Sequence, residues 1–434
     1  MIKKLEKDQE KFYKKIKKKI LFSSNKSGLN IFTYLSISDK LSFNKMKNIL
    51  DKKNSFKYIF EYIKSILSFF YYYQFSIHKS TIEDNNDKLI ITWGKLTDFN
   101  INGQFKDRFL GLRSNEQKKT LWVIQLDGNL TPKIIDKNII VLKKSNKKKF
   151  YFLYIIKFFR DIKLSLKILS NLSYKSLYAL IFFDKINLEV DYDKIKNIVL
   201  PYEGQPFQKY FIRKAKKKNI NIIGYIHTYP QPIPFNLFNY PLCSPNKIVV
   251  NSMSLKKTLV DYFKWKKKHV IIKNSSRFFK NGKVDMTKKI FLPYAINEKK
   301  KLLTLFSNYL KLINNNSLPF FEIQIHPEKI NDKYHKKFKD KLLKIISNNK
   351  DKFIKNKKNK TSLFFGYTSS IIEALERGAK VVQICSEPIL ETYTSLFVYE
   401  IKCKKINQFT YEYDLIKKNS LIRMARVKHY KTFY

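Results

Sequence analysis

Apolar residues recur in two different patterns along this chain, and the change between them marks its first division. Over residues 1–86 they fall at helical spacing among many lysines, as in SFKYIFEYIKSILSFFYYY at residues 55–73. From residue 88 onward they form short runs rich in β-branched and aromatic side chains, which alternate with amphipathic stretches. The patterns predict helices before residue 86 and alternating strands and helices after it.

The short apolar runs predict a series of strands, and the amphipathic stretches between them predict helices. We expect strands at residues 88–94, 120–126, 195–204, 220–227, 247–252, 268–278, 289–295, 320–327, 361–366 and 379–385. We expect helices at residues 150–169, 205–219, 253–265, 297–313, 336–349 and 371–378. Strand and helix alternate at the length of βαβ units, which implies parallel sheets with helices on both faces.

A polar stretch at residues 279–289, FKNGKVDMTKK, interrupts this alternation before it starts again. A chain of 434 residues is also long enough for two cores. We therefore predict an α/β fold with two Rossmann-like domains facing a cleft. The expected division is a lysine-rich helical region over residues 1–86, a first domain over 87–280 and a second over 281–434.

The formal net charge of +52 first suggests a nucleic acid or an anionic membrane as the partner. Only eight of the 87 basic residues are arginine, however, and the abundance of Lys, Asn, Ile, Phe and Tyr is typical of an AT-rich genome. Proteins that read phosphates commonly use arginine for its bidentate contacts. We expect no specific nucleic acid, although a nucleic-acid-binding protein driven by charge alone stays the alternative from another functional class.

Three widely spaced cysteines without a CxxC pair indicate a reducing compartment and no disulfide framework. The first residues carry charges throughout, and no uncharged run reaches the roughly 18 residues of a spanning helix. We therefore expect a cytoplasmic protein. The aromatic, basic stretch at residues 150–169 suits peripheral association with the inner face of the cytoplasmic membrane, but core packing is the commoner reason for such a stretch.

The strand ends of the first half carry a small set of polar residues, and ligands of parallel sheets bind at the carboxyl ends of strands. Glu203 ends an apolar run and is followed by Gly204 and Gln205. A carboxylate packed against apolar side chains suits a general base, because burial raises its pKa. It also suits a first-turn acid of the helix that begins near Pro206. His227 ends the next strand and would line the same cleft.

The second half carries two further signals at strand ends. His326 follows a strand and suits a donor to a phosphate oxygen, or a polar cap of the loop. Gly366 follows another strand, and Thr368, Ser369 and Ser370 fall where the next helix begins. Free N–H groups, the helix dipole and hydroxyl donors together form an anion site, although serine and threonine are also the ordinary caps of any helix.

Other chemistries lack their sequence patterns. The chain has no GxxxxGK[ST] loop, no GxGxxG between a strand and a helix, no HExxH and no GxSxG. These absences argue against nucleotide hydrolysis on a P-loop, nicotinamide chemistry, a dedicated metal site and a serine hydrolase. We expect neither a metal nor a resident cofactor.

The ordered set of motifs resembles the GT-B glycosyltransferases of bacterial surface-carbohydrate biosynthesis, and more distantly the Kdo transferases and bacterial sialyltransferases. The resemblance covers about residues 88–400 and rests on ITWG…GQFKDRFLGL, YEGQPFQKYF…NIIGYIHTY, KIVVNS, FEIQIHP and GYTSSIIEALERGAKVVQI. The distant relatives have two acids before the glycine, whereas Tyr202 precedes Glu203 here.

The resemblance implies a metal-independent glycosyltransferase with a nucleotide-sugar as co-substrate. Its acceptor would be a surface polysaccharide or a lipid-linked glycan. In that family the acid before the glycine is the general base, here Glu203, and the histidine and serine pair hold the nucleotide phosphate, here His326, Ser369 and Ser370. An epimerase or a non-catalytic member of the same fold stays an alternative.

Overall fold

The computed structural model describes most of the chain from residue 74 onward. The described residues are 74–116, 119–127, 130–145, 174–202, 206–226, 237, 239, 244–261, 263–279, 285–294, 296, 298–355, 358–366, 368, 370–385 and 400–425. The predicted helices before residue 74 and the stretch at residues 150–169 lie outside them.

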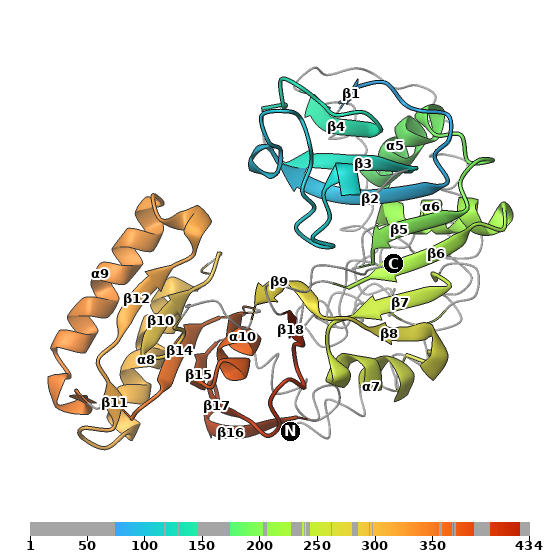
Figure 1. Ribbon diagram of the computed structural model, residues 1–434. Coiled ribbons are helices and arrows are strands. Elements are labelled where there is room, and N and C mark those ends of the chain that lie inside the picture. Colours follow the sequence, from blue (N-terminus) through green and yellow to red (C-terminus); the bar gives the residue numbers. More distant parts are fainter. Residues whose placement is uncertain are drawn as a thin grey trace, which may run out of the picture.

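An eight-stranded sheet forms the first α/β unit, drawn from blue to yellow in Figure 1. Its strand order is β1-β4-β3-β2-β5-β6-β7-β8, and every neighbouring pair is parallel except β1 and β4. The strands are β1 (Gln74–Lys79), β2 (Lys88–Lys95), β3 (Thr120–Asp127), β4 (Ile139–Ser145), β5 (Asn197–Pro201), β6 (Asn221–Tyr225), β7 (Lys247–Val250) and β8 (Val270–Ile272). The helices are α5 (Tyr174–Glu189), α6 (Pro206–Lys217) and α7 (Met253–Asp261).

The two faces of this sheet are covered by different kinds of structure, because successive side chains of a strand point to opposite faces. On one face, Leu89 shares a buried cluster with Phe182 of α5 and Phe211 of α6. On the other, Ile90 shares a cluster with Phe105, which lies in the loop that follows β2. Helices therefore cover one face, and this loop at residues 96–116 takes part in covering the other.

A six-stranded sheet forms the second unit, drawn in orange and red in Figure 1. Its order is β12-β10-β14-β15-β17-β16, with the first four strands parallel and the last two added antiparallel. The strands are β10 (Lys289–Leu292), β12 (Glu322–Ile325), β14 (Thr361–Phe365), β15 (Lys380–Ile384), β16 (Ile401–Asn407) and β17 (Thr410–Leu415). The helices are α8 (Lys299–Leu312), α9 (Lys333–Ser347) and α10 (Ser370–Glu376), and β11 (Leu318–Pro319) pairs with β13 (Phe353–Ile354).

The predicted α/β fold with two Rossmann-like units is confirmed, but several elements differ from the prediction, and β4 and α5 were not expected at all. Residues 74–79 form β1, although the helical region was expected to reach residue 86. The predicted strand at residues 268–278 is divided into β8 and β9 (Ser275–Phe279), and β9 pairs with β18 (Met424–Ala425) in a small sheet of its own. The hairpin of β16 and β17 extends the second sheet. A tight turn is enough to join these two strands, because an antiparallel pair requires no crossover helix.

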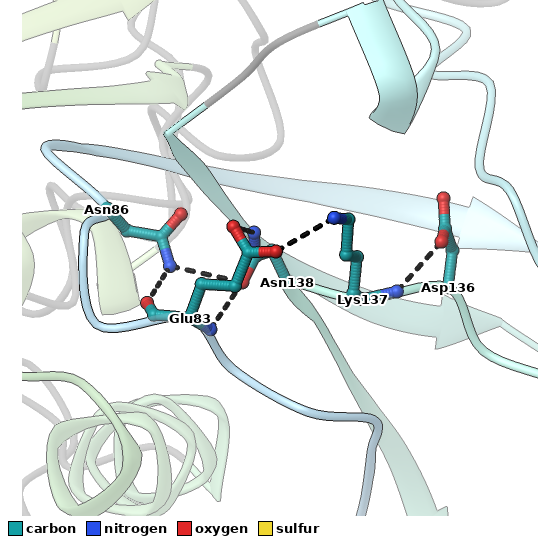
Figure 2. A network of polar contacts seen from close by, with 5 residues as sticks. All are labelled: Glu83, Asn86, Asp136, Lys137 and Asn138. Atoms are coloured by element: carbon teal, nitrogen blue, oxygen red, sulfur yellow. Dashed lines mark hydrogen bonds and ion pairs between the residues drawn. The ribbon is translucent and has the colours of Figure 1, made fainter.

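A polar network fixes the amino edge of the first sheet, where β2 and β4 begin (Figure 2). Asn138 Oδ1 accepts hydrogen bonds from the Glu83 N–H at 2.7 Å and from Asn86 Nδ2 at 3.2 Å. Lys137 Nζ lies 2.8 Å from Glu83 Oε1, and this ammonium lowers the pKa of the Glu83 carboxyl. The network lies at the edge opposite to the one where parallel sheets bind ligands, so we assign it to stability.

Candidate functional site

Each sheet has a switch point, the place where the chain stops adding strands on one side and continues on the other. In the first sheet the chain moves from β2 to β3 and β4 and then places β5 on the opposite side of β2. In the second it moves from β10 to β12 and then places β14 on the opposite side of β10. Ligands of open α/β sheets bind outside the carboxyl ends of the strands at such points.

The switch point of the second sheet is formed by the turns that follow β10 and β14. A Cβ on Gly366 would lie 3.7 Å from Pro293 Cγ, so the two turns are close neighbours. Gly366 has a φ of +67°, in the left-handed region that favours glycine. Its N–H donates to the Ile384 carbonyl at 2.8 Å, and its own carbonyl accepts from Gln383 Nε2 at 2.6 Å. The turn that carries Gly366 is therefore held from β15.

An aromatic and basic cluster lies beside this switch point. The rings of Tyr294 and His326 meet edge to face, with centroids 5.4 Å apart and planes at 85°. Lys329 Nζ lies 4.3 Å from the Tyr294 ring centroid, and the Lys329 N–H donates to the His326 carbonyl at 2.7 Å. Tyr294 is 52% exposed. The cluster thus combines an accessible aromatic ring, an ammonium and an imidazole, the groups that suit a base or sugar ring and a phosphate.

The turn between β14 and α10 brings two hydroxyls together. The Thr368 hydroxyl donates to Ser370 Oγ at 3.3 Å and accepts the Ser370 N–H at 3.3 Å, so Thr368 caps the helix locally. Ser370 Oγ accepts from Thr368, which leaves the Ser370 hydrogen for a ligand. Ser369 lies outside the described residues. The structure brings Gly366, Thr368 and Ser370 to the same edge of the sheet as His326.

His335 of α9 supports the turn after β10, a role that the sequence analysis missed. The side chain is buried; its Nε2 lies 3.0 Å from the Pro293 carbonyl oxygen and its Nδ1 lies 2.9 Å from Asp332 Oδ1. Both partners are acceptors, so both bonds form together when the ring carries both hydrogens. The His335 side-chain hydrogen bond, aided by backbone N–H donors, lowers the pKa of the Asp332 carboxyl. The sequence signal for this role was an aspartate at the start of the helix, followed three residues later by a histidine.

A wide depression of about 690 Å³ adjoins this edge at the start of α8, and Ile296, Glu298, Lys299, Lys300 and Lys301 line it. Helix α8 follows β10, so its amino end lies at the same carboxyl edge as Tyr294. The carboxylate of Glu298 lies 3.3 Å from Lys301 Nζ, and Lys299 Nζ lies 4.4 Å from the ring centroid of Tyr334. Three lysines at the positive end of a helix favour an anionic ligand beside the switch point.

Asp107 lies at the switch point of the first sheet, and the sequence analysis quoted it within a motif without giving it a role. Asp107 is 0% exposed. It accepts hydrogen bonds from Thr92 Oγ1 at 3.0 Å and from the N–H groups of Phe109 at 3.0 Å and Leu110 at 2.9 Å. The residues around it, from the ends of β2, β5 and β6, leave no room for a water molecule. Asp107 holds the loop down over the crevice.

The predicted base and its neighbours in the first unit fall outside the described residues: Glu203, Gly204, Gln205 and His227. The chain that leads to them is well fixed. The Tyr202 N–H donates to the Tyr225 carbonyl at 2.7 Å, and its hydroxyl lies 3.4 Å from Ser244 Oγ. A Cβ on Gly224 would come within 2.9 Å of Tyr202 Cβ, so only glycine fits beside this ring. The roles of these four residues stay predictions.

The described residues contain neither a cluster suited to a metal ion nor a helix suited to span a membrane. No group of three or more His, Cys, Asp and Glu side chains comes together there in a way that would hold a metal ion. None of the helices in that part of the chain has both the length and the apolar content needed to span a bilayer.

Comparison with known proteins gave no family. No protein-family model matches the chain, and no curated protein matches it significantly. Among solved structures, a glycosyltransferase from Rickettsia africae ESF-5 is 14% identical, with 68% of this chain and 79% of that chain covered and a TM-score of 0.32. A UDP-GlcNAc 2-epimerase from Neisseria meningitidis, bound to UDP-GlcNAc, is 9% identical, with 71% and 85% covered and a TM-score of 0.34.

A third similar structure is S. aureus MnaA with UDP, which is 10% identical, with 68% of this chain and 78% of that chain covered and a TM-score of 0.33. At these identities and scores the likenesses carry no weight for the activity of this chain. The resemblance to Kdo transferases and sialyltransferases stays a prediction.

Proposed function

We propose that this protein is a glycosyltransferase that binds a nucleotide-sugar at the carboxyl edge of the second sheet. The observation that carries the proposal is the cluster of Tyr294, His326 and Lys329 beside the switch point of β10 and β14. This edge offers an aromatic ring, cationic groups and the hydroxyls of Thr368 and Ser370 at one place.

The proposed chemistry is transfer of the sugar from the nucleotide to an acceptor hydroxyl. Lys329, His326 and the Ser370 hydroxyl would bind the phosphate and stabilise the negative charge that develops on it as the sugar leaves. Tyr294 would pack against the base or the sugar ring. Arrangement of these donors before the reaction lowers the barrier, because no solvent has to reorganise around the leaving phosphate.

The acceptor side of the proposal rests on Glu203. This residue follows β5, one of the two strands at the switch point of the first sheet. Its carboxylate would take the proton from the acceptor hydroxyl, with a surface polysaccharide or a lipid-linked glycan as the acceptor. The basic, aromatic stretch at residues 150–169 would keep the protein at the membrane that presents such an acceptor.

A nucleotide panel tests the donor site first. Melting of the protein with CMP, UDP, GDP and dTDP should show a rise in melting temperature for one of them, because a ligand that binds the folded state raises stability by mass action. Absence of a shift with all four at millimolar concentration would remove the proposal.

A turnover assay then separates transfer from epimerisation. The nucleotide-sugar that corresponds to the best nucleotide is incubated with the protein, and NMR follows release of the nucleotide and change at the sugar carbons. Slow nucleotide release without an epimer supports a transferase, and a new epimer supports the alternative. Glu203→Gln should reduce transfer about 100-fold or more while nucleotide binding is kept.

A further inference from the structure

The chain passes twice between the two units, and the two passages lie side by side. The first passage begins with β9, and the second is the return segment, residues 416–425, which follows β17 and ends in β18. Strands β9 and β18 pair in parallel, with Ser275 opposite Met424 and Phe279 opposite Ala425. Figure 1 shows this small sheet between the two large ones.

The return segment is bonded into the first unit at the start of α7. The carbonyl oxygen of Ser420 accepts from Ser252 Oγ at 3.2 Å and from the N–H groups of Met253 at 3.1 Å and Ser254 at 3.2 Å. Arg423 continues the contact, because its N–H donates to the Asn251 carbonyl at 2.7 Å. A peptide carbonyl thus occupies the positive end of α7, where a side chain ordinarily caps a helix.

The same segment is hydrogen-bonded to one carboxylate of the second unit, and its Leu421 and Ile422 side chains are buried in the apolar cluster that includes Leu375 of α10. Glu376, the last residue of α10, accepts the Asn419 N–H at 2.7 Å on Oε2. Its Oε1 accepts the N–H of Leu421 at 2.7 Å and that of Ile422 at 3.2 Å. Three backbone N–H groups around a carboxylate form an anion-binding nest, and such charge-assisted bonds are stronger than neutral ones.

The closed joint also contains groups that oppose it. The amide oxygen and nitrogen of Asn251 and the hydroxyl of Ser254 are buried and make no hydrogen bond within the described part of the chain. Each of these groups loses its bonds to water when the joint forms, which costs free energy. Both residues also contact the return segment through their backbone, so we expect departure of the segment to readmit water to their side chains.

We propose that Glu376 is a latch that holds the return segment closed between α10 and α7 against this cost. The joint between the two units then has two states. It is closed while the Glu376 carboxylate accepts the three N–H groups, and it is open when these hydrogen bonds break. Helix α10 starts at Ser370 and ends at Glu376, so the latch is on the same short helix as the candidate site. The inference goes beyond the proposed function and does not depend on it.

Hydrogen exchange on the full chain tests the latch in the absence of any ligand. In Glu376→Gln, one oxygen becomes an NH₂ group that faces backbone donors. We expect peptides that contain residues 419–422 and 252–256 to exchange about tenfold faster or more than in the wild-type protein, with α9 unchanged. The matched control is Glu373→Gln on the same helix, because Glu373 pairs with Arg377 and forms no hydrogen bond with the described residues of the return segment.

Three outcomes decide the proposal. Faster exchange of both peptides in Glu376→Gln and not in the control supports it. Faster exchange of the 419–422 peptide alone overturns it, since the grip would then not reach α7. Equal acceleration in α9 also overturns it, because the substitution would then act on the whole fold.

A second variant tests the opposite sign and keeps the proposal falsifiable if Glu376→Gln does not fold. Asn251→Leu replaces the unsatisfied amide with an apolar side chain of similar size, which removes the cost of the closed joint. The peptide with residues 419–422 should then exchange more slowly than in the wild-type protein. Unchanged or faster exchange in this variant would contradict a joint balanced between two states.

Discussion

The two sheets have the same topology at their switch points, but the residues that surround the two switch points differ. In the first unit, Asp107 and its loop pack against β2 and β5 and leave no room for water in the small space between them. In the second unit, the corresponding edge between β10 and β14 carries a half-exposed Tyr294 and the basic side chain of Lys329, next to a depression with three lysines. Equal topology therefore does not mean equal use.

The difference follows from what covers each edge. At the first edge, the Asp107 carboxylate accepts hydrogen bonds from within the protein, so its charge is satisfied there. The second edge presents cationic side chains and hydroxyl groups. An anion would form stronger, charge-assisted hydrogen bonds with them than water does. We read the second unit as the place where a small anionic ligand binds.

The largest effect on nucleotide binding is expected at Lys329. Lys329→Ala should weaken UDP binding about tenfold, because a charge-assisted contact to the phosphate is lost. The measurement is calorimetric titration with UDP. The matched control is Lys106→Ala, an exposed lysine in the loop over the first switch point. Equal losses in both variants would show that only the general positive charge attracts the nucleotide.

Asp107→Asn should act on stability rather than on binding. The new NH₂ group faces a backbone N–H that the carboxylate accepted, so we expect the free energy of unfolding to fall by about 1–3 kcal/mol. Urea unfolding measures this. Asp414→Asn, at an exposed position of β17, should change it by less than about 0.5 kcal/mol. A tenfold loss of UDP affinity in Asp107→Asn would instead place binding in the first unit.

One glycine from each unit gives a smaller, graded comparison. At Gly224 a Cβ would come within 2.7 Å of Pro245 Cγ, so Gly224→Ala should cost about 1–3 kcal/mol through overpacking. At Gly366 a Cβ would meet Pro293 Cγ at an ordinary contact distance of 3.7 Å, so mainly the φ of +67° resists and Gly366→Ala should cost about 1 kcal/mol. Thermal unfolding of both variants tests the order, and a larger loss at Gly366 would contradict it.

The smallest effect concerns the support of the second edge and depends on pH. The folded state holds the pKa of Asp332 below its ordinary value of 3.8, so its carboxylate stabilises the protein at higher pH, and this stabilisation fades as pH falls through that range. Asparagine also caps helices well, so Asp332→Asn removes mainly the charge. The difference in melting temperature between the two proteins should shrink below pH 4; a constant difference would exclude the linkage.

Much of the parallel core was predictable because its strands are continuous apolar runs between turn residues. Polar and apolar residues alternate in IKCKKIN and TYEYDL, which is the pattern of half-buried strands. The sequence analysis did not use this pattern, so it missed the β16–β17 hairpin. The strand-end rule led to His326, Gly366, Thr368 and Ser370. Lys329 gave no signal in a chain with 79 lysines, and Asp107 acquires its meaning only from the fold.

The central claim is that the nucleotide binds at the carboxyl edge of the second sheet, and hydrogen exchange with and without UDP tests it most directly. We predict slower exchange in peptides that cover residues 293–301, 326–330 and 366–371, with no change at residues 92–110. Protection confined to residues 92–110, or the same exchange everywhere in the presence of saturating UDP, CMP, GDP and dTDP, would contradict it.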